Sequence, residues 1–581
     1  MKDLKGLKPF RFSRKKYRNP FPVLPEIIMV RIAEYVTGYR LQQSLETHRD
    51  PALGPLQLGV IPLLAVCRKW RALLAPTFYC HAFVGLKPSE GIQPYSTHPA
   101  HDARALSTLG HDQSIRRLMV IISGRILSNA DSMAAMEDLL RPGRFAGATE
   151  IVLNFDSIGW GDSCCLPGTE ELVQRFAGLI DKTAPNTTAL VLVSPNYLYM
   201  APGSAAAALV RLVARNKTSL GIDSPALQLS IFTKRNPLID LSNFTVSRRT
   251  MWTDILIHII RANAPTLQTL QLGEISGEDF DKLLFANDSQ AIFYPVLWKL
   301  ELHVTSMPMI GRPSLAHVPF PSLIHFDNSH IHPFNDDTIL RSNRANLEFL
   351  RMPLDSILFE QLVRADAFNP KTYMSLVRIE FEYEGGPSML YNGIDGYSMV
   401  ASAFDMAQIA YTVKIKMDSI QSSPIMSQLR SSNTLQNLYA PGLNLNLCQL
   451  NQLLQHYPNL SSLACTFVDK LEGIVGDTPN TRFIRLMRKD CTIKTKIHRL
   501  EMANVGHNCD VRRTGSIVVL LASLIPSLKR VVLVPAKNIY PQHLLGCVIK
   551  AKKKLVYMDL PHFNALRFEV CSLDRPGTVA Q

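Results

Sequence analysis

The 581-residue sequence lacks any apolar run long enough to cross a membrane. Its best apolar run, from Ile517 to Pro526, has about ten residues, whereas a transmembrane helix needs about 20. The N-terminus also lacks the apolar segment of a secretory signal. Charged residues make up only 19% of the chain and hydrophobic residues 46%. This composition excludes collagen-like and mostly disordered chains and indicates large buried cores in a protein that we expect in the cytoplasm or nucleus.

Motifs of catalytic and cofactor-binding sites are absent as well. No HExxH, GxxxxGK[ST], GxGxxG or GxSxG pattern occurs. Gly161-Asp162-Ser163 faintly resembles a hydrolase start, but nothing in the sequence places a histidine near Ser163, and a loop after a strand at 151–155 is the plainer interpretation. The sequence therefore predicts a protein that is not an enzyme and holds no cofactor.

Metal-binding and disulfide patterns are missing too. The ten cysteines form no CxxC pair, which favours reduced thiols in an intracellular protein. His507, Cys509 and Cys491 fall short of the four ligands of a structural zinc site, and the 16 histidines form no cluster at metal-ligand spacing. We expect no metal.

The positive charge is uneven. The chain carries +14, of which residues 1–18 hold +7 and residues 482–499 hold +6. The first cluster fits a nuclear localisation signal, a phosphate-seeking arm or a solvated tail. In the second cluster, Arg482, Arg485 and Arg488 recur every third residue and share one face of a predicted helix, which either meets an acidic partner or faces water. Because the remainder is near neutral, the composition does not indicate a nucleic-acid partner.

Residues 21–84 read as a small helical unit. Leu24-Pro25-Glu26 begins a helix, since proline and an acidic residue suit the first turn, and a polar stretch at 40–54 precedes a second helix. The segment resembles an F-box, with an insert of about 15–20 residues that the family pattern lacks. The matching residues include Leu24, Pro25, Ile28, Ile32, Val36, Leu64, Val66, Cys67 and Trp70.

The resemblance implies that these residues bind the adaptor protein of a cullin-RING ubiquitin ligase. A unit of this size cannot bury all its apolar positions alone, so an exposed patch that includes Leu24 and Trp70 is typical of an interface. The alternative is that the same side chains pack the unit onto the next domain.

From about residue 115 onward, a helical stretch followed by a short Leu-x-x-Leu-x-Leu strand recurs. Its clearest copy spans 252–272, and between Leu267 and Val377 the strand anchors lie about 24–30 residues apart. From Val377 to Leu435 the gap is about twice that, which predicts a unit that is missed or replaced. The other expected anchors are Leu118, Val152, Leu190, Leu227, Leu297, Leu323, Leu347, Leu460, Leu500, Leu528 and Leu555.

This period is similar to that of irregular leucine-rich repeats, which stack into a solenoid with a parallel sheet and outer helices. The predicted fold class is therefore α/β, with a three-helix F-box-like unit followed by a horseshoe-shaped repeat domain. An ordinary α/β domain is the alternative. We expect a basic arm at 1–20, the helical unit at 21–84, a linker at 85–113, the repeat-like domain at 114–574 and a frayed tail at 575–581.

Together these features predict the substrate-recognition subunit of a cullin-RING ubiquitin ligase. The F-box-like unit would bind the ligase adaptor and the repeats a protein substrate. The alternative is a non-catalytic repeat scaffold whose F-box-like unit does not bind the adaptor. A hydrolase hidden in the α/β region is a third interpretation, disfavoured by the missing motifs.

Overall fold

The structure is a computed structural model and describes part of the chain. The described residues are 80–85, 110–123, 130–155, 169–194, 204–224, 240–304, 319–328, 343–354, 369–383, 396–467, 495–505, 524–536 and 566–571, with short gaps in 240–304 and 396–467 and with isolated residues elsewhere. The chain divides into two compact units, Met1–Phe78 and Tyr79–Gln581. Everything described below belongs to the second unit.

Nineteen strands of the described residues form one sheet, whose main strands pair in parallel and follow the order of the sequence. No pairing among these strands joins β1 to β20 or β21, so the sheet is open. Parallel neighbours require crossover connections, and in several of these connections the structure describes a helix. The strands are β1 (His81–Val84), β2 (Arg117–Ile122), β3 (Glu150–Phe155), β4 (Ala189–Val193), β5 (Ser219–Asp223), β6 (Asn243–Val246), β7 (Thr269–Ile275), β10 (Lys299–Val304), β11 (His325–Asn328), β12 (Phe349–Leu354), β13 (Arg378–Tyr383), β14 (Thr412–Lys416), β15 (Ile420–Gln421), β16 (Asn437–Leu445), β17 (Ser462–Phe467), β18 (Arg499–Val505), β19 (Arg530–Pro535), β20 (Arg567–Cys571) and β21 (Val579–Ala580). Two further short strands, β8 (Phe285–Asn287) and β9 (Gln290–Ala291), form a separate hairpin.

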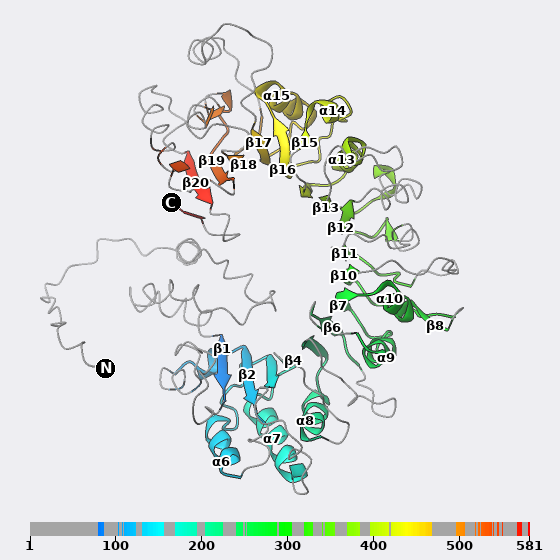
Figure 1. The fold of residues 1–581 in the computed structure, drawn as a ribbon, viewed down its shortest axis with the longest axis vertical. Coiled ribbons are helices and arrows are strands. Elements are labelled where there is room, and N and C mark those ends of the chain that lie inside the picture. Colours follow the sequence, from blue (N-terminus) through cyan, green and yellow to red (C-terminus); the bar gives the residue numbers. More distant parts are fainter. Residues whose placement is uncertain are drawn as a thin grey trace, which may run out of the picture. The chain divides into compact units, whose positions relative to one another are not determined.

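The described helices lie on the convex side of a curved sheet (Figure 1). They are α6 (Ala130–Leu139), α7 (Thr169–Thr183), α8 (Ala205–Ala214), α9 (Asp254–Ala262), α10 (Gly277–Leu284), α13 (Gly396–Asp405), α14 (Ser423–Met426) and α15 (Leu447–His456), with short 3-10 turns at Asp112–Ser114, Pro370–Thr372 and Met406–Gln408. In α7, Val173, Phe176 and Ile180 recur every three or four residues and are buried on one face. Side-chain oxygens cap α8, α9, α10 and α15. None of the helices in the described part of the chain is long and apolar enough to span a membrane.

One row of apolar side chains runs across the sheet and forms the centre of the core. From β1 to β19 each of the main parallel strands places one such residue in register with its neighbours, and each is at most 1% exposed. Burial of this row on every strand stabilises the stack, because no single strand and helix can bury its own apolar face. The row consists of Ala82, Leu118, Ile151, Leu190, Leu220, Phe244, Leu270, Leu300, Phe326, Leu350, Ile379, Val413, Leu438, Leu463, Leu500 and Val531.

A second buried row lies three residues earlier, in the turn before each strand. Seven of the expected strand anchors occupy it rather than the strands: Leu267, Leu297, Leu323, Leu347, Leu435, Leu460 and Leu528. In the clearest copy, the backbone N–H groups of Thr266 and Leu267 both donate to the carbonyl of Asn263, which closes this turn and points Leu267 inward. The prediction that Val377 is an anchor was wrong: Leu376 is the buried residue, and Val377 is 44% exposed.

The wide gap between Val377 and Leu435 contains the unit that the spacing predicted. Helix α13 and strand β14 lie there, and Val413 of β14 pairs with Ile379 and Leu438. Anchors Leu227 and Leu555 lie outside the described residues. Sequence reasoning missed β5 and β6, because short strands with polar residues give little periodicity.

Both ends of the repeat-like unit differ from expectation. Residues 81–84, assigned to the end of the helical unit, form β1, because alternate residues Ala82 and Val84 are buried beside β2. Val579 and Ala580, expected in a frayed tail, pair with β20 in antiparallel fashion. An edge strand offers unpaired backbone groups that a following segment can satisfy.

Candidate functional site

Opposite the helices, the sheet exposes alternate residues of each strand. On β10 to β14, one such residue of each strand is in register with the next and together they form a row: Glu301, Asp327, Arg351, Glu380 and Lys414. Because alternate side chains of a strand point to opposite faces, all of them share the face opposite the described helices. We call the ionisable residues on this face the charged patch; its members are Lys299, Glu301, His325, Asp327, Arg351, Arg378, Glu380, Glu382, Lys414 and Lys416.

Arg351 bridges two acidic residues at the centre of the charged patch. Its Nη1 lies 3.5 Å from Asp327 Oδ2 on β11, and its Nη2 donates to Glu382 Oε2 on β13 at 3.1 Å. The two carboxylates keep only 17% and 13% of their side-chain surface exposed. Pairing of half-buried charges of this kind is worth more than the pairing of exposed ones and fixes the position of the arginine.

Glu380 and Glu382 are each paired with two cations, and only Arg378 comes from their own strand β13. Lys414 Nζ lies 2.8 Å from Glu380 Oε1, and Arg378 Nε donates to the same oxygen at 2.7 Å. Lys416 pairs with Glu382 beside Arg351. Burial acts to raise the pKa of both carboxyls, but these hydrogen bonds and charges outweigh it, so the pKa of each lies below its usual value.

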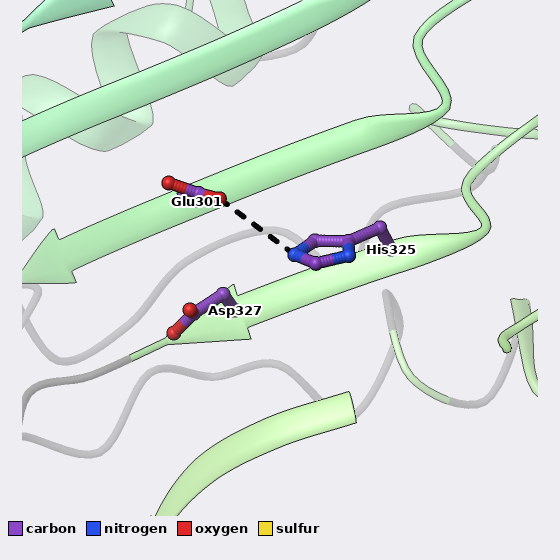
Figure 2. Close-up of side chains that lie close together, drawn as sticks. All are labelled: Glu301, His325 and Asp327. Carbon is purple, nitrogen blue, oxygen red and sulfur yellow. Dashed lines mark ion pairs between the residues drawn. The ribbon is translucent and has the colours of Figure 1, made fainter. Parts of the chain in front are cut away.

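At the other side of the charged patch, Glu301, His325 and Asp327 lie close together (Figure 2). Glu301 comes from β10, and the other two are alternate residues of β11. His325 Nε2 is 3.7 Å from Glu301 Oε1, which Lys299 Nζ approaches at 2.9 Å. The imidazole stacks on the Phe349 ring with centroids 4.1 Å apart and an interplanar angle of 7°. This stacking holds the ring in place on the sheet surface.

The pKa values of His325 and Asp327 are shifted in opposite directions by the same cause. Burial, assisted by the charge of Lys299, lowers the pKa of His325 to about 4. Burial also raises the pKa of Asp327 to about 6, although Arg351 opposes this. Both shifts favour the neutral form, because an apolar environment disfavours charge. At neutral pH His325 is thus uncharged and Asp327 is ionised.

One ligand atom from each of these three residues could hold a metal ion. The three atoms lie within 4.8 Å of one another, and neither His325 Nε2 nor Asp327 Oδ1 has a hydrogen-bond partner among the described residues. However, Lys299 and Arg351 already approach the two carboxylates. A metal would have to displace these cations, so the arrangement fits an ion-pair network better than a metal centre.

An apolar strip borders the charged patch at the amino-terminal ends of β10, β13 and β14. We call it the apolar edge; it consists of Phe293, Val296, Trp298, Met374, Val377 and Tyr411, six of the eight large hydrophobic residues that are exposed in the described part of the chain. Backbone hydrogen bonds set the strand starts side by side in the order Trp298, Ile324, Glu348, Val377 and Tyr411, so Ile324 and Glu348 lie between Trp298 and the Val377–Tyr411 pair. Concentration of exposed apolar and aromatic side chains in one strip is typical of a binding surface.

The residues predicted for adaptor binding all lie outside the described residues, so they remain predictions: Leu24, Pro25, Ile28, Ile32, Val36, Leu64, Val66, Cys67 and Trp70. Ser163, His507, Cys491 and Cys509 also lie outside the described residues, as does most of the basic cluster at 482–499. Cys80 and Cys465 are described, and both are buried thiols that form no disulfide.

Sequence reasoning did not find the charged patch. Its members are spread over about 120 residues in short strands, and only the parallel register brings them together. A comparison with models of known protein families found no match, and a comparison with curated proteins found none either.

Proposed function

We propose that this protein is a non-catalytic recognition protein whose sheet face opposite the described helices binds a protein partner. The observation that carries this proposal is the charged patch on β10 to β14 with the apolar edge beside it. Aromatic residues and arginine dominate the binding energy of protein interfaces, and a rim of paired charges adds specificity. Stacked parallel strands with outer helices fit an irregular leucine-rich-repeat horseshoe, an architecture suited to extended partners.

The partner surface can be tested by substitution. We expect Trp298→Ala with Tyr411→Ala to weaken binding of a partner by at least about tenfold, because truncation of such anchors costs about 2 kcal/mol or more. Ile549→Ala is the matched control, since Ile549 is 49% exposed but lies outside the apolar edge. Binding would be measured by interferometry with a partner identified by cross-linking to the intact protein. Equal affinity of both variants would refute the assignment.

We further propose that the protein presents this partner to a cullin-RING ubiquitin ligase. Support comes from the F-box-like pattern of residues 21–84, whose Leu24, Pro25 and Trp70 stand at the family's apolar positions. In this proposal the repeat-like unit captures the substrate, and transfer chemistry belongs to other subunits of the ligase.

Co-expression with the ligase adaptor tests the ligase proposal. We expect the two proteins to co-purify through gel filtration as a stoichiometric complex. The variant with Leu24→Ala, Pro25→Ala and Trp70→Ala should lose the adaptor while its circular dichroism spectrum stays unchanged. Absence of a complex with a folded wild-type chain would leave a repeat scaffold that binds partners without the ligase, and the apolar-edge test would then still decide the binding proposal.

A further inference from the structure

The acidic and basic side chains of β13 and β14 differ in how far they reach into solvent. The carboxylates lie close to the sheet, and Glu380 and Glu382 keep only 15% and 13% of their side-chain surface exposed. The ammonium groups that pair with them are more exposed, with 37% of the side chain at Lys414 and 72% at Lys416. A partner that approaches this face of the sheet meets cations before carboxylates.

Cations also outnumber carboxylates on these two strands. Among the described residues of β13 and β14, the ionisable side chains on this face are Glu380 and Glu382 against Arg378, Lys414 and Lys416. The pKa of each carboxyl lies below its usual value, so both are charged at neutral pH. The part of the charged patch on β13 and β14 therefore carries a net positive charge.

The arginines and the lysines of the charged patch differ in the donors that they leave for a partner. Arg378 directs its Nε and Nη2 at Glu380. Arg351 directs its Nη1 at Asp327 and its Nη2 at Glu382. Each lysine of β14 has three N–H donors and pairs with one carboxylate of the described residues. The lysines are thus the groups best placed to bind an anionic side chain.

The spacing of the two lysines selects the shape of the ligand. Lys414 and Lys416 are alternate residues of β14, so they point to the same face about 7 Å apart along the strand. An extended chain spaces its own alternate side chains equally, so two acidic residues separated by one position match the two ammonium groups. Tyr411 of the apolar edge directly precedes β14 and lies three residues before Lys414.

We propose that this surface binds an extended acidic segment of the protein partner. Two acidic side chains at alternate positions would pair with Lys414 and Lys416, and an apolar side chain about three positions away would pack beside Tyr411. Charge complementarity carries this choice, because the outermost groups of β13 and β14 are cations. The inference rests on the proposed partner-binding function and names the class of segment that the surface recognises.

A nucleic acid matches this surface less well than an acidic protein segment. Affinity for nucleic acids comes mainly from many lysine and arginine contacts to phosphates. Here the arginines are held by carboxylates, and exposed apolar and aromatic side chains adjoin the cations. The mixture of exposed lysines and apolar anchors is that of a protein interface with a charged rim.

Selection of peptides from a displayed random library on the full chain tests the inference. We expect enriched peptides to carry acidic residues at alternate positions with an apolar residue nearby. The affinity of the tightest peptide is then measured by fluorescence anisotropy. A counterpart peptide, in which glutamine and asparagine replace the acidic residues, should bind about tenfold more weakly, since each exposed charge pair contributes about threefold.

Substitution of the lysines locates the binding of this peptide on β14. Lys414→Gln with Lys416→Gln should weaken binding of the peptide about tenfold and reduce its dependence on salt. Lys182→Gln with Lys529→Gln is the matched control, because both lysines are exposed and lie outside the charged patch. Lys416→Gln alone, at the more exposed residue, should weaken binding about threefold and replaces the double variant if that variant does not fold.

The inference is overturned if no acidic peptides are enriched, or if the lysine variant and its control bind the selected peptide alike. Loss of binding only in Trp298→Ala with Tyr411→Ala would retain the proposed partner-binding function and remove the acidic segment. Unchanged binding in both variants would contradict the function and the inference together. A labelled single-stranded oligonucleotide that binds more tightly than any selected peptide, and that the lysine variant no longer binds, would identify a nucleic-acid surface instead.

Discussion

Replacement of His325 or Asp327 should change the pH dependence of stability in opposite directions. The neutral form of His325 is favoured in the folded chain, where its pKa falls from 6.5 to about 4. As the pH falls from 6.5 towards 4, the unfolded chain gains a proton that the folded chain does not, so the fold loses stability. Asp327, whose pKa rises from 3.8 to about 6, behaves oppositely: between these values the folded chain keeps a proton that the unfolded chain loses, and stability falls as the pH rises.

The two contributions are of similar size and oppose each other in the wild type. At about 1.4 kcal/mol per pH unit of difference, each amounts to about 3 kcal/mol before solvent is considered. The side chains retain 24% and 17% exposure, and screening by water reduces each contribution to about 1–2 kcal/mol. Between pH 4 and 6 the wild-type pair should therefore add little net pH dependence.

Each single variant should uncover the contribution of the other residue. We expect His325→Asn to become more stable relative to wild type as the pH falls from about 6 to 4, and Asp327→Asn to become less stable over the same range, by about 1–2 kcal/mol in each case. Urea unfolding at a series of pH values, followed by tryptophan fluorescence and circular dichroism, measures this. The double variant is the matched control and should restore the wild-type profile. Parallel profiles for both single variants would refute the assigned burial of the two groups.

Three further predictions concern the framework that holds the site. Phe326→Ala should destabilise the fold by about 3–5 kcal/mol in urea unfolding, because Phe326 is fully buried in the central row, whereas Phe293→Ala, at a residue 53% exposed, should change it by under about 1 kcal/mol. Lys217→Ala should lower the free energy of unfolding by about 2–3 kcal/mol, because the buried Lys217 Nζ donates to the carbonyl and the Oγ1 of Thr187. The double variant Lys217→Leu with Thr187→Val should lose less, since other repeats place leucine at the position of Lys217. Equal losses in thermal unfolding would contradict this. Asn263→Ala should lower the free energy of unfolding by about 1–3 kcal/mol, because the Leu241 N–H donates to Asn263 Oδ1 at 2.8 Å. The same variant should speed hydrogen exchange of the Leu241 amide, and unchanged exchange would argue against this hydrogen bond.

Single positions show how much of the fold the sequence predicts. The 24–30-residue spacing correctly indicated repeated helix–strand units, because every unit must bury an apolar residue in the same place. It even located the unit that holds Val413 in the wide gap. The spacing does not distinguish a leucine of the buried row in the turns from one of the buried row in the strands. Leu297 lies in the turn, and Leu300, three residues later, lies in the strand. Val377 beside Leu376 shows that apolar character alone does not distinguish an exposed edge from the core.

The sequence by itself determined the α/β class, the repeat period and the absence of known catalytic motifs, since these follow from local periodicity and residue identity. Only the tertiary structure decided which charges meet. Arg351 reaches Glu382 across 31 residues, and Arg499 stands beside Arg530, because parallel register aligns residues whose distance along the chain carries no pattern. The pKa shifts of His325 and Asp327 likewise arise from burial and neighbouring strands, which no single segment of the chain contains.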